Sequence, residues 1–419
     1  MRSLGLALLC MGVLWAEPLT LKQVQQLALE HSPLLREGES KVREARYRVD
    51  EAYTQVAPTV QLSAGANRTT PSVSAQFGGR SVDIIPEYNY NAQLSLRQTL
   101  LTFGRLRWSA ASAELQEKSQ QADLQDRRLR LLEESALLYY ETLLTQEQVR
   151  ISEDLVKARQ AHLRDAHNLV KAGSAAVFDV KRDEAALAQA EQQLLEARNR
   201  AGLARIRLFT LIQQNDQGQV LEEAAAPPPP PKDELDAAMQ RRFDLQAVRW
   251  AAEAARARVL LQEAADNPNL GFQTDYTLRN QTGLSPAYQW VVGLNLQIPL
   301  YDGGLAQARA DQAREVVQQL ESQYEQARRQ AQVELQSLAL DVENRYQRIE
   351  VARRSLDSAQ ESARIARLRY QNGLSTNVEL LDAEANLTQA QQDWMVARYQ
   401  YWQNLARWKR AFAQEEPSP

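Results

Sequence analysis

Two long segments without a proline or a glycine restrict the fold of this chain more than any other feature. They cover residues 105–172 and 305–372. Each holds about 67 residues and would span roughly 100 Å as one helix. Ala, Gln, Glu, Leu and Arg dominate both, and helices of this length occur in coiled coils rather than in globular cores. Each segment is followed by a glycine and a second helical pattern, so the sequence predicts two helical hairpins, over about 105–213 and about 305–413.

The chain contains two copies of one pattern. Gly173 and Glu184 in the first copy match Gly373 and Glu384 in the second at one constant offset. A slightly larger offset aligns the upstream parts, because the loop 67–87 is longer than its partner 279–287. Each copy therefore has the order helix, strand, loop, strand, long helix, turn, helix. The predicted organisation is a signal segment 1–16, a first repeat 17–223, a proline-rich linker 224–232, a second repeat 233–414 and a tail 415–419.

Four segments alternate apolar and polar residues with the period of two that β-strands show. They are predicted over about 58–67, 87–99, 268–279 and 287–299. Alternation alone also fits four half-buried strands of a soluble sheet. All four alternate over about 10 residues, however, which is the length that a tilted membrane strand needs. The aromatic residues beside the loops then predict a girdle at one membrane interface: Tyr88, Tyr90, Tyr288 and Trp290.

Four strands cannot close a barrel, and an open sheet edge in lipid leaves backbone groups unpaired at several kcal/mol each. Other copies of the chain must therefore complete the barrel. Two copies would give about eight strands, whose interior fills with side chains, whereas three would give about twelve and leave room for a lumen. For a channel, the sequence favours a trimer.

The N-terminal residues 1–16 have the pattern of a secretory signal, with Arg2, an apolar run and Ala16. The one cysteine, Cys10, lies inside this segment, and lipidation there is the alternative. No later apolar run is long enough for a transmembrane helix, so we expect any membrane crossing to be made by strands.

Composition and motifs exclude several other functions. Lys and Arg (49) nearly balance Asp and Glu (53), which argues against nucleic acid as a partner. One cysteine and three histidines give no metal cluster, and His162 and His167 lie on different faces of a helix. No phosphate-binding loop or catalytic triad is recognisable. We therefore expect no enzyme, no cofactor and no metal, with energy supplied by a partner.

The chain resembles the TolC-like outer-membrane efflux proteins over nearly all of its length after the signal segment. The resemblance implies a mainly α fold with a small β part, in which long helical hairpins form a periplasmic helical barrel. It also implies four strands per protomer in a trimeric 12-stranded outer-membrane β-barrel, a periplasmic adaptor and an inner-membrane pump. Short segments carry it: 19–21 (LTL), 98–104 (QTLLTFG), its copy 298–304 (IPLYDGG), the turn 369–374 (RYQNGL) and 381–383 (LDA).

The hairpin turns are the candidate functional site. Gly173 and Gly373 supply the positive φ that a helix stop needs. A cap is a sufficient reason for both glycines; the resemblance adds that the turns contact the adaptor, through Ser174, Ala175, Leu374 and Ser375.

Acidic residues come after both turn glycines. Glu379 and Asp382 share a helix face, which an ordinary solvated face would also explain. The resemblance places them in an acidic ring that favours cations at a periplasmic constriction. It also implies that Tyr370 bonds to Asp179 on the neighbouring hairpin. The family's second link, through an arginine two residues after the second glycine, is missing because Ser375 stands there.

The leading hypothesis is a passive exit duct of a tripartite efflux or type I secretion system in the outer membrane, gated at its periplasmic tip. The alternative is a periplasmic coiled-coil adaptor or an envelope-spacing protein without a channel. The cargo is left open as drugs, metal ions or a polypeptide.

Overall fold

A computed structural model describes residues 19–85, 87–173, 176–216, 221, 227–230, 235–280 and 286–413. The predicted signal segment 1–16, the tail 415–419, most of the linker 224–232, and the turn residues Ser174 and Ala175 lie outside them. The chain divides into two compact units. One consists of Met1–Arg36, Gln125–Arg242 and Arg329–Pro419, and the other of Glu37–Leu124 and Phe243–Arg328.

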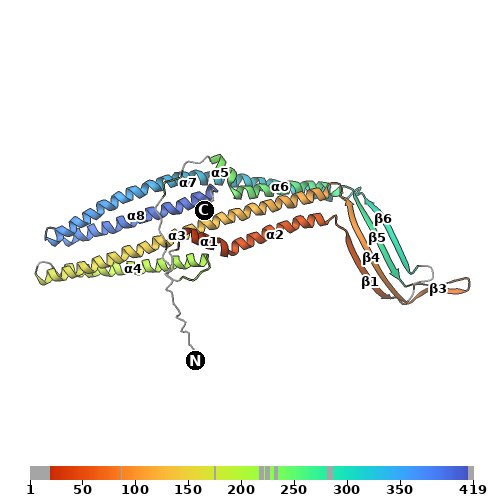
Figure 1. Ribbon diagram of the computed structural model, residues 1–419, viewed down its shortest axis with the longest axis horizontal. Helices are drawn as coiled ribbons and strands as arrows, with labels where there is room; N and C mark the ends of the chain where they lie inside the picture. Colours follow the sequence, from red (N-terminus) through yellow and green to blue (C-terminus); the bar gives the residue numbers. More distant parts are fainter. Residues whose placement is uncertain are drawn as a thin grey trace, which may run out of the picture. The chain divides into compact units, whose positions relative to one another are not determined.

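The first unit is helical, and its main elements are the two predicted hairpins (Figure 1). The first hairpin joins α3 (Arg105–Lys171) to α4 (Val177–Leu211), and the second joins α7 (Leu305–Gln371) to α8 (Asn377–Ala411). Both α3 and α7 begin in the second unit and run into the first without a break. Two short helices complete the unit, α1 (Leu21–His31) and α5 (Leu235–Arg241).

Large aromatic side chains form the core of the first unit. Tyr139 is buried, and its hydroxyl donates to the carbonyl of Leu19, at 2.9 Å. Tyr401 is buried as well and donates to the carbonyl of Pro227, at 2.8 Å. Each aromatic ring thus packs inside while its polar end fixes a chain segment that precedes a helix of the unit.

The second unit contains a four-stranded antiparallel sheet in the order β1-β4-β5-β6 (Figure 1). Its strands are β1 (Thr59–Arg68), β4 (Tyr88–Leu101), β5 (Asn269–Arg279) and β6 (Tyr288–Gln297). Helix α6 (Phe243–Glu263) lies along the start of α3, where Ser112 donates to the carbonyl of Ala254, at 3.0 Å. The short helix η1 (Ala264–Asp266) follows α6.

Strand register keeps apolar residues on one face of the sheet, as the alternation predicts. Leu62 lies opposite Leu94, Leu94 opposite Tyr276, and Tyr276 opposite Trp290. All four side chains of this row are at least 41% exposed. Ser95 and Asp275 pair in the neighbouring row, which points to the other face.

The structure corrects two details of the predicted order. The loop 67–87 contains a hairpin of its own, β2 (Val73–Phe77) and β3 (Arg80–Ile85), turned by Gly78 and Gly79 at positive φ. The predicted first helix of each repeat is two helices. In the first repeat α1 stops at Ser32, and α2 (Pro33–Thr54) starts at a proline, which has no N–H to continue the helix.

Among the helices that the structure describes, none combines the length and the apolar character needed to cross a lipid bilayer.

Candidate functional site: the hairpin turns

Both hairpins reverse at a glycine in the left-handed region. Gly173 has φ 75° and Gly373 has φ 69°, and an added Cβ at either would meet nothing within 4 Å. The backbone conformation, not the space, therefore requires glycine. Each glycine closes its helix: its N–H donates to the carbonyl of Val170 in the first turn and of Tyr370 in the second, at 3.0 and 2.9 Å. The structure thus places both predicted turn glycines where a helix stops.

The two turns differ in how the returning helix begins. In the second, the side chain of Thr376 caps α8 by accepting from the N–H of Glu379, at 3.3 Å. In the first, Ala176 stands at the cap position and supplies no side-chain bond. Leu374 is 69% exposed beside the second turn, and Ser375 is half-buried.

The predicted acids lie close to the starts of the returning helices. Glu379 and Asp382 are exposed on α8, and neither has an ion-pair partner among the described residues. Asp179 lies in the first turn of α4 and is exposed to solvent over part of its surface. Asp179 and Glu379 lie in the first turns, where the helix dipole favours negative charge, and Asp382 lies about one turn farther along α8.

Tyr370 lies between the hairpins. Its ring contacts the ring of His162 edge-on, with centroids 5.2 Å apart. Burial raises the pKa of Tyr370, and the charges of Asp183, Asp179 and Asp165 raise it further. The structure brings Tyr370 and Asp179 within electrostatic range, but among the described residues the Tyr370 hydroxyl makes no hydrogen bond to Asp179.

The acid buried deepest here is Asp183, which the sequence did not single out. It is 2% exposed, and its Oδ1 accepts from Nδ2 of Asn377 on the other hairpin, at 3.1 Å. Farther along α8, Glu384 accepts from Arg159 at 2.9 Å and from Arg367 at 3.0 Å. Arg159 and Glu384 are both buried, so this ion pair joins α3 to α8 inside the unit.

A comparison of the two repeats in sequence could not have shown that Glu384 is buried in an ion pair. Its counterpart Glu184 occupies the same place in the pattern, yet the Glu184 side chain is 41% exposed and pairs with Lys181 on its own helix. A buried ion pair depends on which helix packs opposite, and local sequence does not carry that information.

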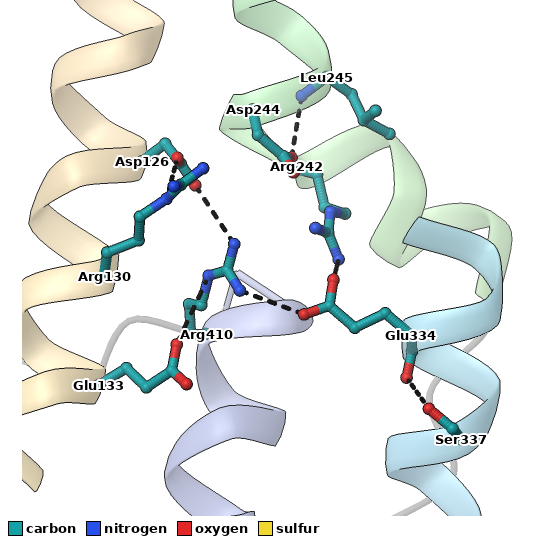
Figure 2. Close-up of polar contacts among 9 residues, drawn as sticks. All are labelled: Asp126, Arg130, Glu133, Arg242, Asp244, Leu245, Glu334, Ser337 and Arg410. Atoms are coloured by element: carbon teal, nitrogen blue, oxygen red, sulfur yellow. Dashed lines mark hydrogen bonds and ion pairs between the residues drawn. The ribbon is translucent and has the colours of Figure 1, made fainter. Parts of the chain in front are cut away.

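A second cluster of charged residues lies far along the same helices (Figure 2). Arg410 of α8 contacts Asp126, Glu133 and Glu334, at 3.9, 3.7 and 3.1 Å. Arg242 also pairs with Glu334, at 2.7 Å. Burial raises the pKa of the Glu133 carboxyl, while Arg410 and Arg407 lower it in part. Within this unit the cluster ties α3, α7 and α8 together at the end of α5.

The predicted girdle residues lie at one end of the sheet. Tyr88 and Tyr90 begin β4, and Tyr288 and Trp290 begin β6, which runs in the same direction. All four side chains are at least 49% exposed. Their role at a membrane interface stays a prediction.

Metal binding has no support in the described residues, which contain no group of three His, Cys, Asp or Glu side chains able to hold an ion.

Comparisons with known proteins agree on one kind of molecule. The family described as outer membrane efflux protein matches residues 24–213 and 235–413. Outer membrane protein TolC of Escherichia coli is 25% identical over 413 residues, covering 93% of this chain and 81% of the relative. Proteases secretion protein PrtF of Dickeya chrysanthemi is 24% identical over 410 residues, covering 90% and 84%. The solved structure of the outer-membrane channel OprN superposes with a TM-score of 0.81 at 24% identity, covering 94% of this chain and 90% of that one.

Proposed function

This chain belongs to the outer membrane efflux protein family, and from that membership we propose that three copies assemble into one exit duct gated at its periplasmic end. The chain is an outer-membrane channel component of an efflux or secretion system. It lies in the outer membrane and extends into the periplasm.

The open sheet carries the proposal. Among the described strands, β1 pairs only with β4 and β6 only with β5, so both edges of the sheet are free. The apolar face is exposed at the same time, as Leu62 (72%) and Leu294 (68%) show. An apolar face requires lipid, and lipid does not tolerate free edges. Joining β6 of one copy to β1 of the next satisfies both conditions, and three copies leave a lumen.

The hairpin turns supply the gate in this proposal. Each copy contributes Glu379 and Asp382, exposed and without counter-charges in the described chain, on one face of α8. Around a common axis these carboxylates form a ring that attracts cations and repels anions. Asp179 and Tyr370 lie behind the ring between the hairpins. The turn residues Gly173, Ser174, Gly373, Leu374 and Ser375 form the surface for a periplasmic adaptor, which links the duct to an inner-membrane pump.

The experiment that tests the proposal compares adjacent positions on opposite faces of β6. Leu294 belongs to the apolar face and Asn295 to the polar face. We expect the wild-type chain and Asn295→Arg to fractionate with the outer membrane as a trimer that dissociates on a gel only after heating. Leu294→Arg costs about 2–4 kcal/mol near the middle of the bilayer and should lose that trimer. A wild-type monomer that dissolves without detergent would refute the duct and favour the periplasmic spacer.

A further inference from the structure

Large apolar side chains gather where the strands of the second unit pass into the long helices. β4 leads into α3 through residues 102–104, and β6 leads into α7 through residues 298–304 (Figure 1). Leu300 is 93% exposed and Tyr301 is 89% exposed, so one copy of the chain leaves both uncovered. We refer to the following five side chains, each at least 51% exposed, as the junction belt: Leu101, Phe103, Ile298, Leu300 and Tyr301.

The junction belt continues the apolar face of the sheet. Leu101 lies opposite Leu270, and Leu270 lies opposite Leu296, in the apolar row nearest the helices. A register shift just before Leu101 brings it into this row. Ile298 and Leu300 follow Leu296 at steps of two, the period that keeps side chains of an extended chain on one face. The belt and the apolar face therefore form one surface.

Phe103 belongs to the belt through a backbone conformation that side chains rarely adopt. Its φ is 46°, in the left-handed region. Nδ2 of Asn267 donates to the carbonyl of Phe103, at 2.7 Å, and so helps to hold this conformation. The Phe103 side chain is 51% exposed, so burial does not explain the strain. A strained backbone that its surroundings maintain indicates a function for the side chain that it presents.

The spacing between the junction belt and the predicted girdle matches the thickness of an outer membrane. Trp290 and Leu300 stand ten residues apart, which is about 33 Å along an extended chain. A strand tilted by about 40° covers about 25 Å of that along the membrane normal, the height of the apolar band in outer-membrane barrels. Aromatic side chains favour both boundaries of such a band. With the girdle at the outer boundary, the belt lies at the periplasmic one.

Two arginines follow the junction belt in the first repeat. Arg105 and Arg107 begin α3, and neither has an ion-pair partner within the described part of the chain. The guanidinium of Arg107 lies over the ring of Trp108, 4.8 Å from its centroid. The rise of a helix places the two arginines about 3 and 6 Å beyond Phe103 along the helix axis. The polar layer of a bilayer is about 5–7 Å thick on each side, so both arginines reach the level of the lipid headgroups.

The junction of the second repeat has a different charge. Leu305 and Gln307 occupy the positions that Arg105 and Arg107 have in the first repeat. Asp302 precedes them, and its carboxylate accepts from three backbone N–H groups at the start of α7. A site for an anion is therefore restricted to the first junction of each copy.

We propose that the junction belt lies at the periplasmic boundary of the outer membrane and that Arg105 and Arg107 bind the phosphate of an anionic phospholipid there. A guanidinium presents its donors in a fork that matches phosphate oxygens. Leu101 and Phe103 contact the adjoining part of the acyl chains. The proposal rests on the proposed function in one respect, namely that the apolar face of the sheet contacts lipid.

Fluorescence quenching in proteoliposomes tests the position of the belt. A Cys10→Ser background removes the one native cysteine, and Tyr301→Cys then carries a single dye. Lipids with a nitroxide near the headgroup should quench this dye at least threefold more than lipids with a nitroxide at the chain end. Leu294→Cys, nearer the middle of the apolar band, should show the opposite order. Glu325→Cys lies about 30 Å along α7 and should be quenched by neither lipid.

Two outcomes of this experiment contradict the proposal and separate it from the duct. If lipid nitroxides quench the Leu294 dye but not the Tyr301 dye, the belt is refuted and the duct is unaffected. If they quench neither dye, the sheet does not contact lipid, and both proposals fail.

Native mass spectrometry of the detergent-solubilised full-length protein tests the phosphate site. The wild-type chain should bind phosphatidylglycerol about thirtyfold more tightly than phosphatidylcholine, because each arginine near an anionic headgroup contributes about fivefold. Arg105→Gln combined with Arg107→Gln should remove this preference. Arg328→Gln combined with Arg329→Gln is the matched control, since it removes two exposed arginines farther along α7, and it should keep the preference.

Three results would refute the phosphate site. The first is equal binding of the two lipids by the wild-type chain, and the second is an unchanged preference in the variant without Arg105 and Arg107. The third is displacement of phosphatidylglycerol by an equal concentration of inorganic phosphate, which would assign the two arginines to a free anion instead of a lipid.

Discussion

Nη1 of Arg159 lies 2.9 Å from Oε2 of Glu384, although the two residues stand in different repeats. Their side chains are only 10% and 8% exposed. Glu384 has a second ion-pair partner, Arg367, at 3.0 Å, and the Arg367 side chain is 53% exposed. One buried carboxylate thus connects three helices of the two hairpins.

Arg159→Met should destabilise the folded protein by about 3 kcal/mol, because it leaves Glu384 buried with only its half-exposed partner. Arg150→Met is the matched control on the same helix: Arg150 pairs with Glu147 at 2.5 Å, but its side chain is 72% exposed. The control should cost less than about 1 kcal/mol. Urea unfolding in detergent measures both variants, and equal losses would contradict a special role of the buried pair.

Gly373→Ala should destabilise the protein by about 1–2 kcal/mol, because φ 69° places the new Cβ in the left-handed region. Gly202 provides the opposite case, since it lies inside α4, and a Cβ there would also meet nothing within 4 Å. Gly202→Ala should stabilise the protein by about 0.5–1 kcal/mol. Thermal unfolding measures the stability of both variants. If both substitutions changed the stability in the same direction, the assignment of backbone strain to the turn would be refuted.

Combined Glu379→Gln and Asp382→Asn should weaken block by divalent cations and reduce cation selectivity in planar-bilayer conductance, because the substitutions remove the proposed acidic ring. Glu191→Gln combined with Glu196→Gln removes two exposed acids of α4 and serves as the control. This control should conduct as the wild-type chain does. Unchanged block in the first variant would exclude the ring from the mechanism.

Glu133→Gln should change how stability depends on pH. Because burial raises the pKa of Glu133 above 4.5, the folded protein holds this proton at pH values where the unfolded chain has released it. The stability that the group contributes is therefore lost as the pH rises from 4.5 through the raised value. The stability of the variant minus that of the wild-type chain should therefore be larger at pH 7 than at pH 4. Urea unfolding at both pH values measures this, with Glu134→Gln at the neighbouring position as the control; a pH-independent difference would contradict it.

The long helices and the sheet faces could be predicted because both depend on local pattern. Absence of proline and glycine between Arg105 and Lys171 allows one helix, and the period of two in β6 puts Trp290 and Leu294 on one face. The β2–β3 hairpin was missed because it interrupts the repeat and has no counterpart against which to recognise it.

The candidate site was predictable only in part. The turn glycines and the acids beside them can be located from their position in the repeat. Asp183 and Glu384 cannot, because their burial arises from contacts with helices of the other hairpin. Glu184 and Glu384 share their sequence context and differ in surroundings, so only the packed structure separates them.

The β2–β3 hairpin also has a consequence for symmetry. It extends the connection between strands of the first repeat, and the second repeat has only the shorter connection 280–287. A closed ring built from this chain must therefore alternate long and short loops along its outward rim. In the proposed trimer, an external molecule at this rim would contact three copies of the β2–β3 hairpin, whereas the duplicated strand pairs below repeat twice as often.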